Sequence, residues 1–202
     1  RGGSNDVPDI EARALEFMDR ASLDLIFHRY PEIPNAAQGG AVWFEQESTE
    51  GAEDVLLEKG YRLIVETGGL VDQSWFAISP DDQRRMRQFR HAIPESVYEY
   101  LTDHGQVKLG TDMAVPDQHL RTLMDFYRST LAEASIRAVT YGHIGNAHLH
   151  VNMLCTGADE YQRALDAYGR MVRAALSLGG TISAEHGVGK IKKDYLRMMF
   201  GD

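Results

Sequence analysis

The sequence has a single cysteine, Cys155, among its 202 residues, and no apolar run long enough to cross a membrane. A lone thiol cannot form a disulfide within the chain, which is compatible with a reducing compartment. A membrane-spanning helix needs about 18 consecutive apolar residues, and the first residues lack the charged-then-apolar pattern of a secretory signal. We therefore expect a cytoplasmic protein without a transmembrane segment, with peripheral attachment to the inner face of a membrane as an open alternative.

Basic residues are also scarce, because 21 Lys and Arg stand against 30 Asp and Glu and give a net charge of −9. An acidic surface repels polyphosphate, so nucleic acid is excluded as a partner. Apolar residues make up 43% of the chain and charged residues 25%, which is ordinary for a protein that buries a core. The length suggests one domain or at most two small ones.

The apolar patterns predict alternating strands and helices with one hairpin. We expect strands over residues 12–19, 40–47, 75–78, 108–115, 136–143 and 148–154. We expect helices over the segment that carries residues 23–27, over 49–66, from 80 with a kink or restart at Pro94, from 116, and over 159–178. This order predicts an α+β fold in which helices cover a largely antiparallel sheet, as one domain over residues 12–202. Residues 1–11 are interpreted as a linker or a cloning remnant.

Three of the eight histidines lie within eight residues of the predicted hairpin. If residues 146–147 form a two-residue turn, His143 faces His150 with Cβ atoms about 4.5–5.5 Å apart, close enough to share one metal ion. The two-residue period of a strand puts His148 on the same face and the intervening aliphatic residues in the core. The alternative is a hairpin whose imidazoles only pack or form hydrogen bonds.

A second unusual stretch, residues 179–190, is a loop with four glycines around Glu185 and His186. The carboxylate of Glu185 could complete a two-histidine, one-carboxylate metal site with His143 and His150. His186 would then be a free imidazole beside the ion, suited to proton transfer near neutral pH. The alternative is a helix entry in which Glu185 accepts from first-turn amides and the following lysines face solvent.

The sequences HIGNAHLHVN at 143–152 and GGTISAEHGVGK at 179–190 resemble the C-terminal substrate, or cap, domain of FAD-linked oxidases, the family that includes D-lactate, glycolate and D-2-hydroxyglutarate dehydrogenases. The resemblance extends upstream through FRHAIPE at 89–95 and KLGTDMAVP at 108–116. It implies a ferredoxin-like form of the α+β fold. It also implies two cofactors, namely FAD held mainly by a domain absent from this chain, and a divalent metal, for which zinc is the expected ion.

The resemblance also implies roles for individual residues. His143, His150 and Glu185 match the family's metal ligands, and His186 matches its catalytic base. Together these residues imply oxidation of a D-2-hydroxy acid, of the D-lactate or glycolate kind, to the 2-keto acid. His186 would take the hydroxyl proton while hydride leaves for FAD.

Three further residues are implied as substrate contacts. Arg90 and Lys108 match family residues that bind the substrate carboxylate. His148 stands where asparagine is usual, and because it faces the active site we assign it to substrate binding, with assistance to the metal or a change in which hydroxy acid fits as open alternatives. The spacing from Lys108 to Asp112 is longer than in hydroxyglutarate-type members and favours a lactate-like branch.

The expected partners are a small 2-hydroxy acid, the protein's own N-terminal FAD-binding domain and an electron acceptor that the sequence does not identify, and a homodimer is left open. By this interpretation the chain is the excised cap of a flavoenzyme and is inactive alone. Two other functions stay open from the residues themselves. One is a free-standing zinc hydrolase that uses His143, His150 and Glu185, and the other is a non-catalytic interaction module stabilised by metal.

Overall fold

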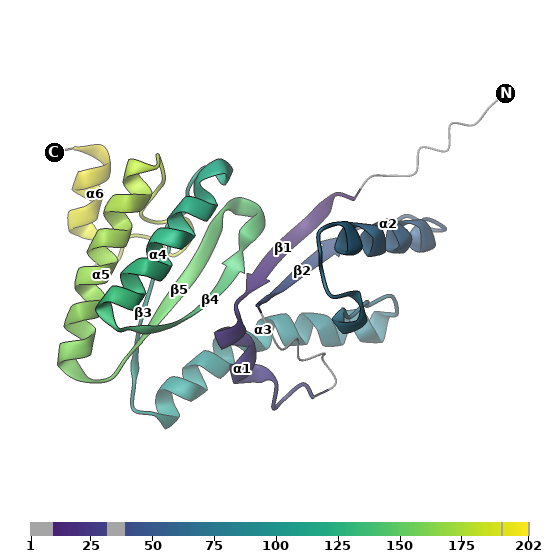
Figure 1. Ribbon diagram of the computed structural model, residues 1–202, viewed down its shortest axis with the longest axis horizontal. Coiled ribbons are helices and arrows are strands. Elements are labelled where there is room, and N and C mark those ends of the chain that lie inside the picture. The colour runs from purple at the N-terminus through teal and green to yellow at the C-terminus, as the bar shows by residue number, and fades with distance from the viewer. Residues whose placement is uncertain (1–9, 32–38, 191, 202) are drawn as a thin grey trace.

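The protein is described by a computed structural model at residues 10–31, 39–190 and 192–201. Within these residues the strands are β1 (Ala12–Met18), β2 (Ala41–Gln46), β3 (Val107–Gly110), β4 (Arg137–His143) and β5 (His148–Cys155). The α-helices are α1 (Arg20–Ile26), α2 (Glu53–Glu66), α3 (Pro80–Asp103), α4 (Leu120–Ala134), α5 (Gly157–Ser177) and α6 (Lys193–Phe200) (Figure 1). Short 3₁₀ turns cover Val71–Gln73, Asp117–His119 and Ile144–Asn146.

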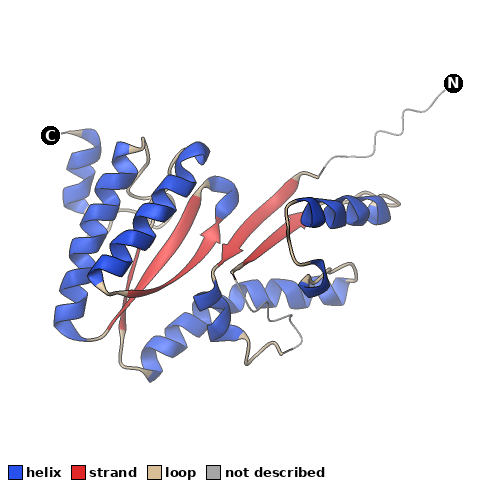
Figure 2. Cartoon of the chain, in the orientation of Figure 1, coloured by secondary structure: helices blue, strands red, loops and turns tan. Residues whose placement is uncertain are grey.

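The five strands form one sheet in the order β2-β1-β4-β5-β3, with every neighbouring pair antiparallel (Figure 2). The expected α+β class with a largely antiparallel sheet is confirmed. Strands β4, β5 and β3 lie in the order of a ferredoxin-like unit, with α4 connecting β3 to β4 and α5 following β5. β1 pairs with β4 only at residues 17–18 opposite 141–142, so the β1–β2 ribbon joins the unit beside the β4–β5 turn.

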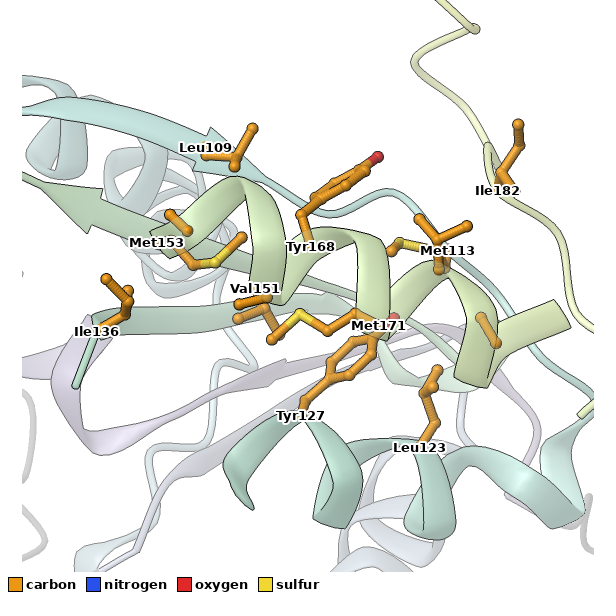
Figure 3. Close-up of a cluster of buried hydrophobic side chains, with 14 of the residues drawn as sticks. Leu109, Met113, Leu123, Tyr127, Ile136, Val151, Met153, Tyr168, Met171 and Ile182 are labelled. Carbon is orange, nitrogen blue, oxygen red and sulfur yellow. The ribbon is translucent and has the colours of Figure 1, made fainter. Parts of the chain in front are cut away.

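Different helices pack on the two faces of the sheet in the ferredoxin-like unit. On one face, Val151 and Met153 of β5 pack against Tyr127 of α4 and against Tyr168 and Met171 of α5 (Figure 3). These side chains are at most 1% exposed, so they form the main core. Burial of this apolar surface stabilises the fold by about 25 cal/mol per Å².

The opposite face is covered only in part. The C-terminal half of α3 packs Val97 and Leu101 against Val139 of β4 and Leu154 of β5. Because side chains alternate along a strand, the residues of β4 and β5 that share this face continue toward the turn as Tyr141, Asn152 and the three histidines. The polar end of this face is the place where a site can form.

Helix α3 begins as the sequence predicts. The hydroxyl of Ser79 accepts from the backbone N–H of Asp82, and Pro80 occupies the first turn, where its missing N–H costs nothing. Pro94 lies inside the helix without ending it, and the helix changes direction along its length (Figure 1). The predicted kink is therefore present without a restart.

Some predicted bounds are wrong. The segment 75–78 is not a strand, since Trp75 packs against the core beside α1 and α3 and the segment pairs with no strand among the described residues. β3 ends at Gly110, and of the expected strand up to residue 115 only Ala114 makes isolated bridges, to His148 and Thr181. Of the expected linker at 1–11, residues 1–9 lie outside the described residues, and β1 starts at Ala12.

Candidate metal and substrate site

The hairpin that carries the histidines has a different register from the predicted one. His143 pairs with His148 and Tyr141 pairs with His150, so the expected direct pairing of His143 with His150 is wrong by two residues. The turn is longer because it contains a 3₁₀ turn and Ala147, which takes a left-handed φ of 48°. A two-residue type I′ turn needs positive φ at both central positions, for which alanine is unsuited. A shift of two residues preserves the face, so the histidines still lie together.

The imidazoles form a compact cluster. Ring centroids are 4.4 Å apart for His148 and His150, 5.7 Å for His143 and His148, and 5.8 Å for His143 and His150. The carboxylate of Glu185 reaches the cluster from the glycine-rich loop, with Oε1 2.8 Å from Nε2 of His150 and Oε2 3.4 Å from Nε2 of His143. One ligand atom from each of these four residues lies within 4.8 Å of the other three. The structure thus brings the three predicted metal ligands together, and His148 with them.

Two of the imidazoles are held so that Nε2 is left for a ligand. Nδ1 of His143 lies 3.0 Å from Oε1 of Glu16, and Nδ1 of His150 lies 3.3 Å from the carbonyl oxygen of Thr111. When each Nδ1–H donates to these acceptors, the lone pair of Nε2 points toward Glu185. A carboxylate or carbonyl behind the imidazole is the usual support for a metal-bound histidine.

The protonation states also suit a cation. Burial lowers the pKa of His148 and of His150, which favours their neutral, metal-binding forms. Burial raises the pKa of Glu185, but the surrounding imidazoles outweigh it and hold that pKa below its usual range. Neutral imidazoles beside an ionised carboxylate are the forms that bind a divalent ion.

Glu16 is a site residue that sequence reasoning missed. Its side chain is 7% exposed, and its Oε1 also contacts Nη2 of Arg90, whose guanidinium lies 5.3 Å from the centre of the Trp43 ring. Glu16 therefore joins His143 to Arg90 across two strands and a helix. The signal in the sequence was one acid inside the apolar strand β1, at a position that the alternation turns inward.

Asp112 is a second missed residue and holds the loop that carries Glu185. Its Oδ2 accepts from Ser183 Oγ at 2.7 Å, from Lys192 Nζ at 2.5 Å and from the His186 N–H at 3.1 Å. Its Oδ1 accepts from the Glu185 N–H at 3.3 Å.

Burial raises the pKa of Asp112, but the hydrogen bonds from Lys192, Ser183 and the two amides outweigh it, and the pKa falls far below its usual range. The alternative of a helix entry at Glu185 is wrong, because residues 181–190 form a non-helical loop anchored to this buried carboxylate.

The cluster opens on a cavity of about 640 Å³ whose walls include Arg90, Lys108 and His186. The His186 side chain is 64% exposed, with Nε2 3.2 Å from Glu185 Oε1. Nζ of Lys108 lies 4.6 Å from the centre of the Tyr98 ring, also in the wall. His148 is not among the described residues that line the cavity, so its assignment to substrate binding stays a prediction.

Comparison with known proteins gives the same family as the motifs. Residues 7–202 match the family described as FAD linked oxidases, C-terminal domain. The chain belongs to this family. The resemblance drawn from the histidine and glutamate motifs is thereby confirmed.

Individual relatives of this FAD-linked oxidase domain are enzymes of 2-hydroxy acids. The chain is 26% identical to "Glycolate oxidase subunit GlcD" of Bacillus subtilis over 91% of this chain and 38% of the relative. It is 26% identical to "D-lactate dehydrogenase" of Anaerostipes hadrus, covering 94% and 41%, and 32% identical to a mitochondrial "D-2-hydroxyglutarate dehydrogenase" of Bos taurus, covering 91% and 33%. The chain thus spans about two-fifths or less of the length of these relatives.

The described helices of this FAD-linked oxidase domain include none that is both long and apolar enough to span a bilayer.

Proposed function

We propose that the protein to which this domain belongs oxidises a D-2-hydroxy acid, of the lactate or glycolate kind, to the 2-keto acid with FAD as electron acceptor. The observation that carries the proposal is the convergence of His143, His150 and Glu185 beside His186 in one cavity. The names of the relatives support this substrate class.

The residues present fit a divalent ion, for which zinc remains the expectation. His143 and His150 each hold Nδ1 against an acceptor and turn Nε2 toward the Glu185 carboxylate. When bound by these three residues, the ion supplies Lewis-acid polarisation of the substrate's hydroxyl and carboxylate oxygens.

His186 is the proposed base. Its imidazole is largely exposed to the cavity, 5.0 Å from the His150 ring between centroids, so a substrate held at the metal site is within reach of its ring nitrogens. It would take the hydroxyl proton of the substrate, and FAD, when bound, would supply the hydride acceptor.

Arg90 and Lys108 are the proposed carboxylate contacts. The guanidinium of Arg90 carries five N–H donors, and its Nη2 donates to Glu16, so the other nitrogens still have donors for a substrate. The contacts with Glu16 and Trp43 fix the plane of the guanidinium. Lys108 adds a point charge held over the Tyr98 ring. Both offset the net charge of −9 where an anionic substrate must bind.

The remaining partners follow from the same proposal. The FAD would be held mainly by an N-terminal FAD-binding domain that packs on this one, an electron acceptor would reoxidise it, and the protein would act in the cytoplasm. The domain alone would contribute the metal and substrate groups without turnover.

The test uses the intact FAD-bound protein under anaerobic conditions, with FAD reduction followed by loss of its visible absorbance. D-lactate, glycolate and D-2-hydroxyglutarate are compared as substrates. His186→Ala is expected to slow reduction about 10²–10⁴-fold, the range for a general base, and Glu185→Ala by at least as much. His28→Ala is the matched control, since His28 is exposed at the end of α1 and does not line the cavity.

Two outcomes would refute the proposal. One is FAD reduction at near wild-type rates in both His186→Ala and Glu185→Ala. The other is hydrolysis by the domain alone, or metal loss that unfolds the protein without changing FAD reduction, because these would favour a hydrolase or a structural metal site.

A further inference from the structure

The structure points to His148 as a fourth protein ligand of the metal. The inference rests on the metal site of the proposed function and changes its composition. We infer that the ion is held by three imidazoles and one carboxylate, from His143, His148, His150 and Glu185. The sequence alone assigned His148 to substrate binding and left assistance to the metal as an alternative.

The first support is position. His148 is the first residue of β5, directly opposite His143 in the register and two residues from His150 on the same face. Its ring is the nearest of the cluster to His150, at 4.4 Å between centroids. Nitrogens that each lie about 2.1 Å from one ion are at most about 4.2 Å apart. Since the four ligand atoms already lie within 4.8 Å of one another, movements below about 1 Å would close the set.

The second support is an unsatisfied polar atom. The His148 side chain is 5% exposed, and its buried Nε2 has no hydrogen-bond partner among the described residues. Oδ1 of Asp112 lies 3.1 Å from this nitrogen, but not in a direction that makes a hydrogen bond. A buried polar group without a partner costs about 1–3 kcal/mol. A metal ion bound through Nε2 of His148 would give this atom its partner.

Burial argues against the earlier assignment to substrate binding. A side chain that is 5% exposed and lies outside the cavity wall cannot present its ring to a substrate that fills the cavity. Its ligand atom lies within 4.8 Å of those of His143, His150 and Glu185, so it can reach an ion that these residues hold.

Asp112 is the competing candidate for a fourth ligand, since its carboxylate also lies within 4.8 Å of ligand atoms of His150, Glu185 and His186. Its oxygens already accept four hydrogen bonds, one of them from the ammonium of Lys192. To bind an ion it would have to release the loop that carries Glu185. By contrast, the buried Nε2 of His148 makes no hydrogen bond among the described residues.

A site of three imidazoles and a carboxylate has consequences for the ion. Nitrogen-rich sets suit zinc, copper, iron and nickel better than magnesium, calcium or manganese, which prefer oxygen ligands. With four protein ligands, an ion that also binds substrate oxygens needs a coordination number of five or six.

The test counts histidines on the metal in the intact protein. The protein is stripped with a chelator, loaded with one equivalent of Cu²⁺, and measured by electron paramagnetic resonance, in which each bound imidazole nitrogen splits the signal. Zn²⁺ affinity is measured separately by competition with a chelator. The variants are His148→Asn, His148→Gln as a longer substitute, and His28→Asn as the control, and circular dichroism of each metal-free protein reports its folding.

We expect three imidazole nitrogens in the wild type and in His28→Asn, and two in both His148 variants. Loss of a group that only supports a ligand costs about 10–100-fold in metal affinity, so Zn²⁺ affinity should fall at least about tenfold in the His148 variants. Two nitrogens in the wild type, or unchanged Zn²⁺ affinity in folded His148→Asn and His148→Gln, would overturn the inference and leave the proposed function standing. Absence of any bound imidazole in the wild type would overturn both.

Discussion

Asp112→Asn should release the loop that carries Glu185 and His186. The substitution removes the negative charge that Lys192 meets at 2.5 Å, while the Lys192 side chain is only 11% exposed. Breaking a buried ion pair by removing one partner costs about 3–5 kcal/mol. Lys192 keeps two neutral acceptors, Ser183 Oγ at 3.0 Å and the Gly187 carbonyl at 2.9 Å, so we expect the lower end, about 3 kcal/mol.

Two assays measure this loss. A chain of about 200 residues loses about 2–4 °C of Tm per kcal/mol, so Asp112→Asn should lower the Tm of the metal-free protein by about 6–12 °C. Hydrogen exchange measured by mass spectrometry should show faster exchange over residues 181–190 than in wild type, with little change in β5. If the loop opens locally before the domain unfolds, exchange in residues 181–190 should speed up by more than the loss of global stability measured from Tm would produce.

A double-mutant cycle with Lys192→Met isolates the ion pair from the other hydrogen bonds of Asp112. The double variant should be less destabilised than the sum of the two single variants, because Lys192→Met removes the cation that Asp112→Asn leaves unpaired. A Tm within about 2 °C of wild type for Asp112→Asn, together with unchanged exchange in the loop, would refute the role given to this carboxylate.

Three further predictions concern the site, the core and pH. Glu16→Gln should weaken Zn²⁺ binding about 10–100-fold, because it weakens the acceptor that orients His143; chelator competition measures it, and unchanged affinity would contradict the role. Met153→Ala, at a side chain that is 0% exposed, should cost about 2–5 kcal/mol in urea unfolding, whereas Met198→Ala, at 50% exposure, should cost within about 0.5 kcal/mol; equal losses would count against the core described. Because the pKa of Asp112 is lowered in the folded state, the folded protein binds fewer protons than the unfolded chain at pH values below the ordinary aspartate pKa of about 3.9. The stabilisation that ionised Asp112 contributes is therefore present above that pH and is lost as the pH falls below it. Tm measured from pH 6 to pH 3 should therefore fall more steeply in wild type than in Asp112→Asn, and parallel curves would show that Asp112 is not the group responsible.

The elements were largely predictable because their signals are local. Ser79 and Pro80 mark the start of α3, and the 3.6-residue apolar period of α4 and α5 marks the faces that cover the sheet. The predicted bounds are wrong where pairing with a distant strand decides the structure, since residues 75–78 are apolar enough for a strand but pair with none in the described part of the chain.

The histidine cluster was predictable even though its register was not. A strand's period of two fixes His143, His148 and His150 to one face, and a register error of two residues leaves that face unchanged. Which histidine faces which depended on the turn, where Ala147 adopts a left-handed conformation that no local rule favours for alanine.

The sequence by itself determined the family, the α+β class, the common face of the three histidines and the loop of Glu185 and His186 as their complement. Only the tertiary structure decided what holds them. Glu16 reaches His143 across 127 positions of chain, and Asp112 reaches Ser183 across 71. The spacing of residues in the sequence does not predict such contacts, because the residues meet only after β1 pairs with β4 and the loop after α5 returns to the end of β3. Burial of His148 was decided in the same way, since exposure depends on what the rest of the chain packs against it.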